Sequence, residues 1–352
     1  MGVRRRRADA LAAGEHQRRA DPGRRPQVPV VAGTAAGRRA RPHRARALTG
    51  SRGARARAGE DEGIDRIGPW QLDTVHNVDC ARGLAALPAG CLDVIVTSPP
   101  YWGQRGAGGL GAEADPRDYV AHLAAVLAEG MRCLRPSGTL WLNVGDAYNT
   151  PINWREGDHV YSSLGVDGAG LPATNSAYTK NRGRRRAFVR EDVGWLRYGN
   201  LLALPYRIVV AMCDRGFLFR GEVIWEKSRP MPEGLCRRPH RRHEGIYVFA
   251  RDERHAFQTR PPVGTVWRLR QTPNLTPHCS TFPLDLPVHC IRAAGLAAPG
   301  AIVCDPFMGS GTTGRAARML GHRFLGFELD REMCRLANAY ARNVRARSPR
   351  RP

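Results

Sequence analysis

Lysine is almost absent from this chain of 352 residues. Only Lys180 and Lys227 occur, so the formal net charge of +23 comes from arginine. Such an excess favours a polyanionic partner such as nucleic acid. An arginine-rich composition can also follow genomic base composition, and much of the excess lies in the first 65 residues. The charge therefore does not all belong to a folded part.

Further absences narrow the class of protein. No run of eighteen apolar residues exists and no signal peptide is evident, which predicts a cytoplasmic protein without a membrane span. None of the nine cysteines forms a CxxC pair, which predicts buried free thiols. Cys236, His240 and His243 lack a fourth ligand at a suitable spacing, so no metal site is expected.

Composition divides the chain into parts. Residues 1–65 are rich in Arg, Ala, Gly and Pro, which predicts a disordered tail. Two interpretations stay open for it: a basic arm that contacts phosphates, or an over-extended start site. Residues 66–347 are expected to form one domain, and residues 348–352 a basic tail. Residues 147–197 form a polar insert, which is either a nucleic-acid-contacting segment or a solvated loop.

One stretch near residue 100 has the character of a site. The nearly continuous apolar run at residues 91–97 predicts a strand buried on both faces of a parallel sheet. Ser98, Pro99, Pro100 and Tyr101 follow it, and the two prolines stop the strand and remove two N–H donors. A hydroxyl, a stiffened carbonyl and an aromatic face suit a planar ring that carries an amino group. Taken alone, the stretch also fits an ordinary proline turn.

A second site is predicted two hundred residues later. The strand at residues 301–304 precedes a glycine turn and a helix, an arrangement typical of nucleotide cradles. The next strand ends at Glu328, which could accept ribose hydroxyls. Spelling alone matches GxGxxG, so a Rossmann NAD-dependent oxidoreductase is an alternative. Asp305 would repel a pyrophosphate but would suit the ammonium of an amino-acid tail, so S-adenosylmethionine fits better.

The two motifs TSPPYW and DPFMGSGTT, in this order, resemble the amino-methylating DNA methyltransferases whose catalytic motif precedes the cofactor motif. The resemblance covers residues 70–343 and includes WEKSRPMPE at 225–233 and CSTFP at 279–283. It implies an α/β, Rossmann-like fold that uses S-adenosylmethionine. A mostly parallel, twisted sheet with helices on both faces is expected, with a circularly permuted order of motifs.

The same resemblance implies residue roles. In that family the Ser-Pro-Pro-Tyr turn binds a flipped base and its amine, which implies catalytic roles for Ser98, Pro99, Pro100 and Tyr101. The residues implied to bind the cofactor are Asp305, Phe307, Gly309, Ser310, Gly311, Thr312 and Glu328, with Phe282 and Pro283 along the methionine side and Asp79 near the adenine.

The chemistry agrees with what the chain lacks. Methylation of cytosine carbon 5 requires a cysteine nucleophile, commonly in a Pro-Cys pair, and no Pro-Cys occurs. An exocyclic amine can attack a methyl sulfonium directly. Family members with Ser at the first motif position often methylate cytosine N4, so Ser98 favours that target over adenine N6. Methylation of RNA or protein amides, and a non-catalytic DNA-binding protein, are further alternatives.

Double-stranded DNA is the expected partner, and a cognate restriction endonuclease is a candidate second partner. Arginine clusters in the insert and in a later loop could contact phosphates, although a plain surface loop explains the later cluster nearly as well. The predicted DNA-contacting residues are Trp102, Arg182, Arg184, Arg185, Arg186, Arg237, Arg238, Arg241 and Arg242.

Overall fold

The computed structural model describes residues 65–103, 109–149, 194–228, 230, 237–269, 282–296 and 298–343. The chain divides into two compact units, Met1–Glu60 and Asp61–Pro352, and every described residue belongs to the second. Almost all of the two predicted tails and most of the insert predicted at residues 147–197 lie outside the described residues. The predicted domain boundaries therefore stay predictions.

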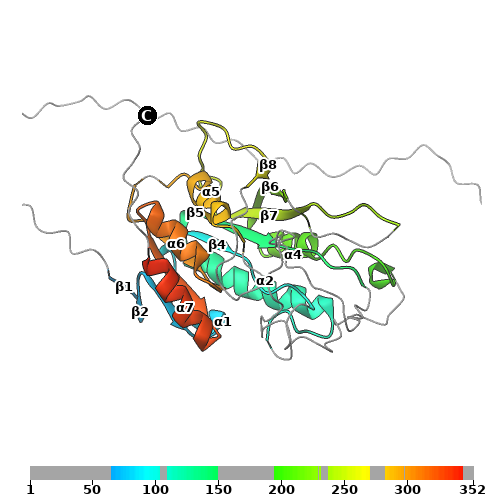
Figure 1. Ribbon diagram of the computed structural model, residues 1–352, viewed down its shortest axis with the longest axis horizontal. Helices are drawn as coiled ribbons and strands as arrows, with labels where there is room; N and C mark the ends of the chain where they lie inside the picture. Colours follow the sequence, from blue (N-terminus) through cyan, green and yellow to red (C-terminus); the bar gives the residue numbers. More distant parts are fainter. Residues whose placement is uncertain are drawn as a thin grey trace, which may run out of the picture. The chain divides into compact units, whose positions relative to one another are not determined.

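One mostly parallel sheet of eight strands organises the described residues (Figure 1). In spatial order the strands are β3 (Thr74–Asn77), β10 (Arg323–Glu328), β9 (Ile302–Asp305), β4 (Leu92–Thr97), β5 (Leu134–Val144), β7 (His243–Ala250), β6 (Leu218–Glu226) and β8 (Val266–Arg268). Neighbours from β3 to β5 are parallel, β7 is antiparallel to β5 and β6, and β8 is parallel to β6. A small ribbon pairs β1 (Arg66–Ile67) with β2 (Trp70–Gln71). The predicted α/β class with a mostly parallel sheet is confirmed.

Helices form layers on the two faces of this sheet. One layer holds α1 (Cys80–Ala85), α2 (Pro116–Cys133) and α4 (Leu204–Cys213), together with the short helix η1 (Gly194–Leu196). The other layer holds α5 (Asp285–Ala293), α6 (Thr312–Met319) and α7 (Arg331–Arg342). None of the helices in the described ranges is long and apolar enough to cross a membrane.

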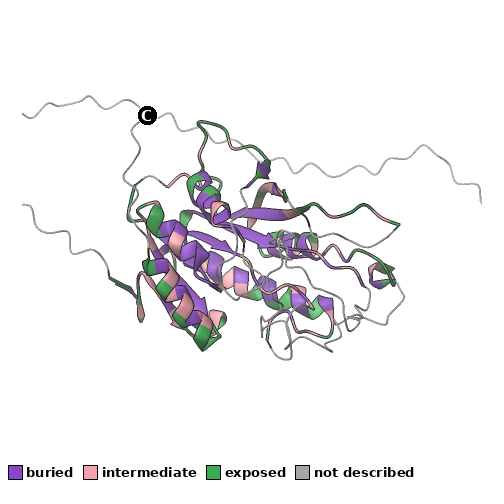
Figure 2. Ribbon diagram, viewed as in Figure 1, coloured by how far each residue is buried: buried purple, intermediate pink, exposed green. Residues whose placement is uncertain are grey.

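Strand β4 separates two hydrophobic cores. Ile95 packs into the core that includes α2, whereas Val94 and Val96 pack into the core that includes α5 and α6. All three side chains are buried, as are most residues of the central strands (Figure 2). Successive side chains of a strand point to opposite faces, so a sheet covered on both sides needs apolar residues at every position. The predicted doubly buried strand is confirmed.

Cysteines in the described part of the chain are free thiols. Cys133, Cys290, Cys304 and Cys334 are buried, which agrees with the sequence-based prediction. Burial raises the pKa of the Cys290 and Cys304 thiols, so both stay neutral. Cys213 is exposed, at the end of α4, and departs from that prediction.

The boundary between α2 and β5 differs from the prediction. The sequence predicts that residues 136–138 separate the helix from a strand beginning at Thr139, but α2 ends at Cys133 and β5 begins at Leu134. The register between β4 and β5 shifts from Leu92↔Leu134 to Val94↔Thr139. Residues 135–138 are thus skipped by the ladder, and the missing N–H of Pro136 removes no interstrand hydrogen bond.

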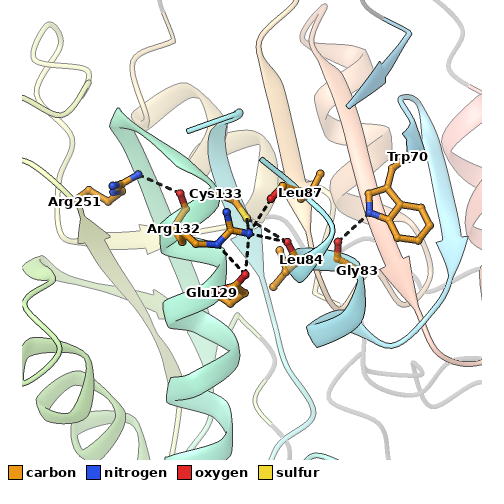
Figure 3. A network of polar contacts seen from close by, with 8 residues as sticks. All are labelled: Trp70, Gly83, Leu84, Leu87, Glu129, Arg132, Cys133 and Arg251. Atoms are coloured by element: carbon orange, nitrogen blue, oxygen red, sulfur yellow. Dashed lines mark hydrogen bonds and ion pairs between the residues drawn. The ribbon is translucent and has the colours of Figure 1, made fainter. Parts of the chain in front are cut away.

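Arg132 joins the ends of α1 and α2 (Figure 3). Its Nη2 donates to the carbonyl oxygens of Leu84 at 3.1 Å and Leu87 at 2.8 Å, and its Nε donates to Glu129 at 2.8 Å. The last carbonyls of a helix lack intrahelical partners, and the guanidinium binds one of them, that of Leu84, together with the Leu87 carbonyl just beyond α1. This contact holds α1, and the chain that leads into β4, against α2.

Asn338 of α7 forms hydrogen bonds with the outer edge of β3, the first strand of the sheet. Its Nδ2 donates to the Val75 carbonyl at 2.8 Å, and the Val75 N–H donates to its Oδ1 at 2.9 Å. We expect Asn338→Ala to lower the free energy of unfolding by about 2 kcal/mol, because it leaves the Val75 N–H unpaired and leaves the Val75 carbonyl with only the weak Cys334 thiol donor at 3.2 Å. Urea unfolding would measure this, with the exposed Asn343→Ala as the control. Equal effects of the two substitutions would contradict the assignment.

Candidate functional site

The two motifs of the sequence meet at the carboxyl ends of β4 and β9. These strands are parallel neighbours, and β4 ends at Thr97 while β9 ends at Asp305. The Thr97 hydroxyl donates to Asp305 Oδ1 at 2.6 Å. Residues more than two hundred positions apart in the chain therefore form one continuous site, at the sheet edge where α/β folds bind ligands.

Asp305 is the most strongly held acid of this site. It is 1% exposed, and its carboxylate also accepts from the Thr313 hydroxyl at 2.6 Å and from the Phe307 N–H at 3.0 Å. Burial raises the pKa of Asp305 to about 6, and the three hydrogen bonds oppose that rise. The carboxylate thus connects β9, the end of β4 and the first turn of α6.

Glu328 ends the next parallel strand, β10. Its Oε2 accepts from the Gly309 N–H at 2.9 Å, and its Oε1 accepts from the Asp330 N–H at 2.9 Å. The side chain is 8% exposed. Glu328 therefore fixes one side of the glycine turn that connects β9 to α6.

Gly311, at the end of that turn, allows the turn to pack closely against α7. Its φ is +86°, and a Cβ at this position would come within 2.7 Å of the Ala337 carbonyl oxygen of α7. Ser310 and Thr312 on either side are buried and share a hydroxyl hydrogen bond of 3.1 Å. Only glycine fits this backbone, which brings the N-terminus of α6 close to the strand ends.

The chemistry of these residues fits S-adenosylmethionine. Asp305 and Glu328 are buried carboxylates on adjacent strands, and neither makes an ion pair with a cation in the described part of the chain. Buried charges usually have partners, so this pair suits a ligand that is itself cationic. S-adenosylmethionine carries a sulfonium and an ammonium, which two carboxylates can attract, and a ribose diol, which can donate hydrogen bonds to them.

The remaining predicted cofactor residues surround this turn. Phe307 is partly buried beside the glycines, and Phe282 and Pro283 lead into α5, which packs against α6. Asp79 caps the N-terminus of α1 by accepting from Ala81 N at 2.9 Å. Since α1 follows β3, the neighbour of β10, Asp79 lies on the Glu328 side of the site. Its predicted contact with adenine stays a prediction.

The proline corner after β4 is braced from several sides. The Tyr119 hydroxyl of α2 donates to the Pro100 carbonyl at 3.0 Å. Ser98 Oγ lies 3.4 Å from the Tyr101 hydroxyl. The Tyr101 ring lies against the backbone of Gly145, where a Cβ would approach it to 2.7 Å. Ser98 therefore sits on a rigid turn directly after Thr97.

Trp102 requires a correction. It was predicted to contact DNA, but its side chain is 1% exposed, belongs to the core of the α2 layer, and donates from Nε1 to the Glu113 carbonyl at 2.9 Å. Burial of a large apolar side chain is favourable by the hydrophobic effect, and Trp102 packs into the core beside α2. We assign Trp102 to packing.

An arginine loop lies beside the same end of the sheet. The guanidinium of Arg238 is 4.1 Å from the ring centroid of Tyr148, and that of Arg241 is 5.7 Å from it. Arg241 also donates to the Asp146 carbonyl at 2.7 Å. Arg237 and Arg242 are exposed. The other predicted arginines lie outside the described residues: Arg182, Arg184, Arg185 and Arg186.

Three polar side chains near Tyr101 were missed by the sequence analysis. Asn143 of β5, Lys227 after β6 and Glu244 of β7 converge behind the tyrosine hydroxyl. One signal was present: Lys227 is one of only two lysines in a chain rich in arginine.

In the described ranges, no group of three or more His, Cys, Asp and Glu residues could hold a metal ion.

Comparisons with known proteins agree with this geometry. The sequence profile of the DNA methylase family matches residues 92–339. The type II methyltransferase M.XycI of Xanthomonas campestris pv. cyanopsidis is 33% identical over 304 residues, which cover 80% of this chain and 94% of that protein. M.SmaI of Serratia marcescens, also a type II methyltransferase, is 31% identical and covers 74% and 87%.

Solved structures share the fold. A DNA modification methylase from Thermus thermophilus, TTHA0409, was solved in complex with S-adenosyl-L-methionine. It aligns with a TM-score of 0.50 at 25% identity, over 76% of this chain and 93% of that one. The PvuII cytosine-N4-specific DNA methyltransferase aligns with a TM-score of 0.53 at 18% identity, over 78% and 90%.

Proposed function

Since the chain belongs to the DNA methylase family, as an amino-methyltransferase of the restriction-modification type that uses S-adenosylmethionine, we propose that it methylates cytosine N4 within a specific sequence of double-stranded DNA. Adenine N6 is the alternative. Membership of this family replaces the nicotinamide alternative that the GxGxxG spelling had left open.

The hydrogen bond between Thr97 and Asp305 carries the assignment of the site. It joins the turn proposed to bind the base to the turn proposed to bind the cofactor, at 2.6 Å between the two oxygens. Methyl transfer needs the attacking nitrogen, the methyl group and the sulfur in line, and such alignment supplies a large share of the rate. Two turns joined in this way would support such an alignment.

When bound, the cofactor supplies a methyl group on a sulfonium. The residues proposed to hold it are Asp305, Phe307, Gly309, Ser310, Gly311, Thr312 and Glu328, with Phe282, Pro283 and Asp79 at the margins. Asp305 and the helix N-terminus would hold the zwitterionic tail, and Glu328 the ribose.

Ser98 and Pro99 would prepare the amine. The lone pair of an exocyclic amine is delocalised into the ring, so the nitrogen must become more tetrahedral before it attacks. Ser98 Oγ and the Pro99 carbonyl would accept its two hydrogens, while the ring stacks on Tyr101. The cationic product nitrogen then loses a proton, so a strong base is not needed before the transfer.

The choice of base has a direct test. Residues 66–352 would be incubated with S-adenosylmethionine and unmethylated genomic DNA, and the nucleosides identified by mass spectrometry. The Ser98→Ala variant serves as the matched control. N4-methylcytosine would support the proposal, N6-methyladenine would show that Ser98 does not select cytosine, and no methylated nucleoside would contradict the activity.

Arg237 and Arg242 are proposed to contact DNA phosphates. Replacing both with alanine is expected to weaken binding to all sequences and to reduce the salt dependence of binding by about one ion for each arginine. Fluorescence anisotropy at several salt concentrations would measure the slope. Arg254→Ala is the control, since Arg254 is highly exposed but follows β7, at the opposite end of the sheet. An unchanged slope in the double variant would contradict the contact.

A restriction endonuclease of the same specificity is the proposed cellular partner, because the similar proteins named above are type II methyltransferases. The substrate would be the cell's own DNA, so we propose that the reaction takes place in the cytoplasm, at the nucleoid. DNA purified from cells that express the enzyme should resist the endonuclease that cuts the methylated sequence.

A further inference from the structure

A chain of polar contacts runs from the catalytic corner into the β6–β7 hairpin. Ser98 Oγ lies 3.4 Å from Tyr101 Oη, which lies 3.1 Å from Glu244 Oε2. Glu244 Oε1 pairs with the Lys227 ammonium. We propose that Glu244 is a positioning residue that makes Ser98 a hydrogen-bond acceptor for the target amine. This inference rests on the proposed methylation of an amine at Ser98.

The direction of the chain follows from its last member. The Tyr101 hydroxyl lies 3.1 Å from Glu244 Oε2 and 3.2 Å from Asn143 Oδ1. Both oxygens only accept hydrogen bonds, so the hydroxyl is the donor, and the charged carboxylate is the stronger of the two acceptors. Burial, together with the charge of Glu244, raises the pKa of Tyr101 well above its usual value, so the phenol keeps its proton. The phenol oxygen then accepts, and the Ser98 hydroxyl donates to it. Both lone pairs of Ser98 Oγ are left to accept hydrogens from a substrate.

Lys227 and Asn143 hold Glu244 in place. The side chains of Lys227 and Glu244 are only 12% and 15% exposed. Asn143 Nδ2 donates to Glu244 Oε2 at 3.4 Å and to the Gly245 carbonyl at 3.1 Å. The ion pair uses Oε1, so Oε2 remains directed at Tyr101. A largely buried ion pair costs desolvation, and its presence beside the proposed reaction centre suits a role in orientation more than in stability.

Without the carboxylate, the Tyr101 hydroxyl keeps only the neutral Asn143 Oδ1 as an acceptor, so the direction of the serine proton is held less firmly. A Ser98 O–H that pointed at the amine would oppose a donor with a donor and would remove one of the two acceptors. The 3.4 Å separation is long for a hydroxyl pair. Catalytic hydrogen bonds commonly shorten when the substrate enters the site.

Glu244→Gln tests the inference with little change in shape. An amide can donate to Tyr101, which permits the reversed chain of hydrogen bonds. We expect kcat to fall roughly 10- to 100-fold, with the Kd values for S-adenosylmethionine and DNA unchanged. Glu222→Gln is the matched control, because Glu222 Oε2 accepts from the Tyr206 hydroxyl at 2.8 Å on the same hairpin. It should keep the wild-type kcat.

Tyr101→Phe separates orientation from simple structural support. If Glu244 acts through the Tyr101 hydroxyl, Glu244→Gln should have no further effect on kcat in the Tyr101→Phe background. A double variant that loses the product of the two single effects would overturn the inference. Full activity of Tyr101→Phe would also overturn it, and this test does not depend on whether a Glu244 variant folds.

The role proposed for Glu244 can be refuted while the proposed methylation of an amine still stands. Loss of activity in Ser98→Ala together with wild-type kcat in Glu244→Gln would leave amine methylation standing and refute the role of Glu244. Wild-type activity in Ser98→Ala would instead refute the proposed site on which the inference depends.

Discussion

Ser98→Ala is expected to lower kcat by roughly 100- to 1,000-fold, the range typical for loss of one preorganised hydrogen-bonding group in a reaction centre. The hydroxyl lies one residue beyond Thr97, at the junction of the two motifs, and is proposed to accept a hydrogen from the target amine. Affinity for S-adenosylmethionine should not change, because the proposed cofactor residues lie on β9, β10, the glycine turn that leads into α6, and the segments that lead into α1 and α5. Single-turnover methylation and isothermal titration calorimetry would measure the two quantities.

Ser137→Ala provides the control for this substitution. Ser137 is exposed in β5, at the end opposite to the site, so its loss should leave kcat and cofactor affinity unchanged. A Ser98→Ala enzyme with near wild-type kcat would show that the acceptor lies elsewhere on the corner, with the carbonyl of Pro99 as the remaining group.

Asp305→Asn is expected to weaken cofactor binding by roughly 10- to 100-fold at pH 7, because it removes the charge proposed to attract the ammonium of the cofactor. The pKa of Asp305 is raised to about 6. Wild-type affinity should therefore rise between pH 5 and pH 7 as the carboxyl ionises, whereas the asparagine variant should show no such rise. Calorimetry at both pH values would measure this.

Stability should change with pH in the opposite sense. The folded-state pKa of Asp305 lies above the usual aspartate value of 3.8, so the folded protein binds the proton more tightly than the unfolded chain. This group favours folding most at low pH, and its contribution falls as the pH rises from about 4 through 6. The asparagine variant should lack that decline. Asp252→Asn, in an exposed turn, is the control.

For the affinity prediction, a wild-type affinity for S-adenosylmethionine that does not change between pH 5 and pH 7 would contradict the proposed contact of Asp305 with the cofactor.

Local patterns were sufficient to predict much of this fold. The apolar run of β4 predicted a strand buried on both faces, because that requirement is written into successive residues. The glycine turn before α6 was predicted because only glycine permits its backbone, as the close approach of Gly311 to α7 shows. The reversal of β7 between β5 and β6 was not predicted, since strand direction depends on partners distant in the chain.

Sequence by itself determined the family, the cofactor and the two turns, because short motifs carry the backbone chemistry of those turns. Tertiary structure alone decided which groups meet across the sheet. It joined Thr97 to Asp305, buried Trp102 in the core, and brought Lys227 and Glu244 to Tyr101. These contacts link strands that are adjacent in space but distant in sequence, and no local pattern encodes which hydroxyl will face which carboxylate.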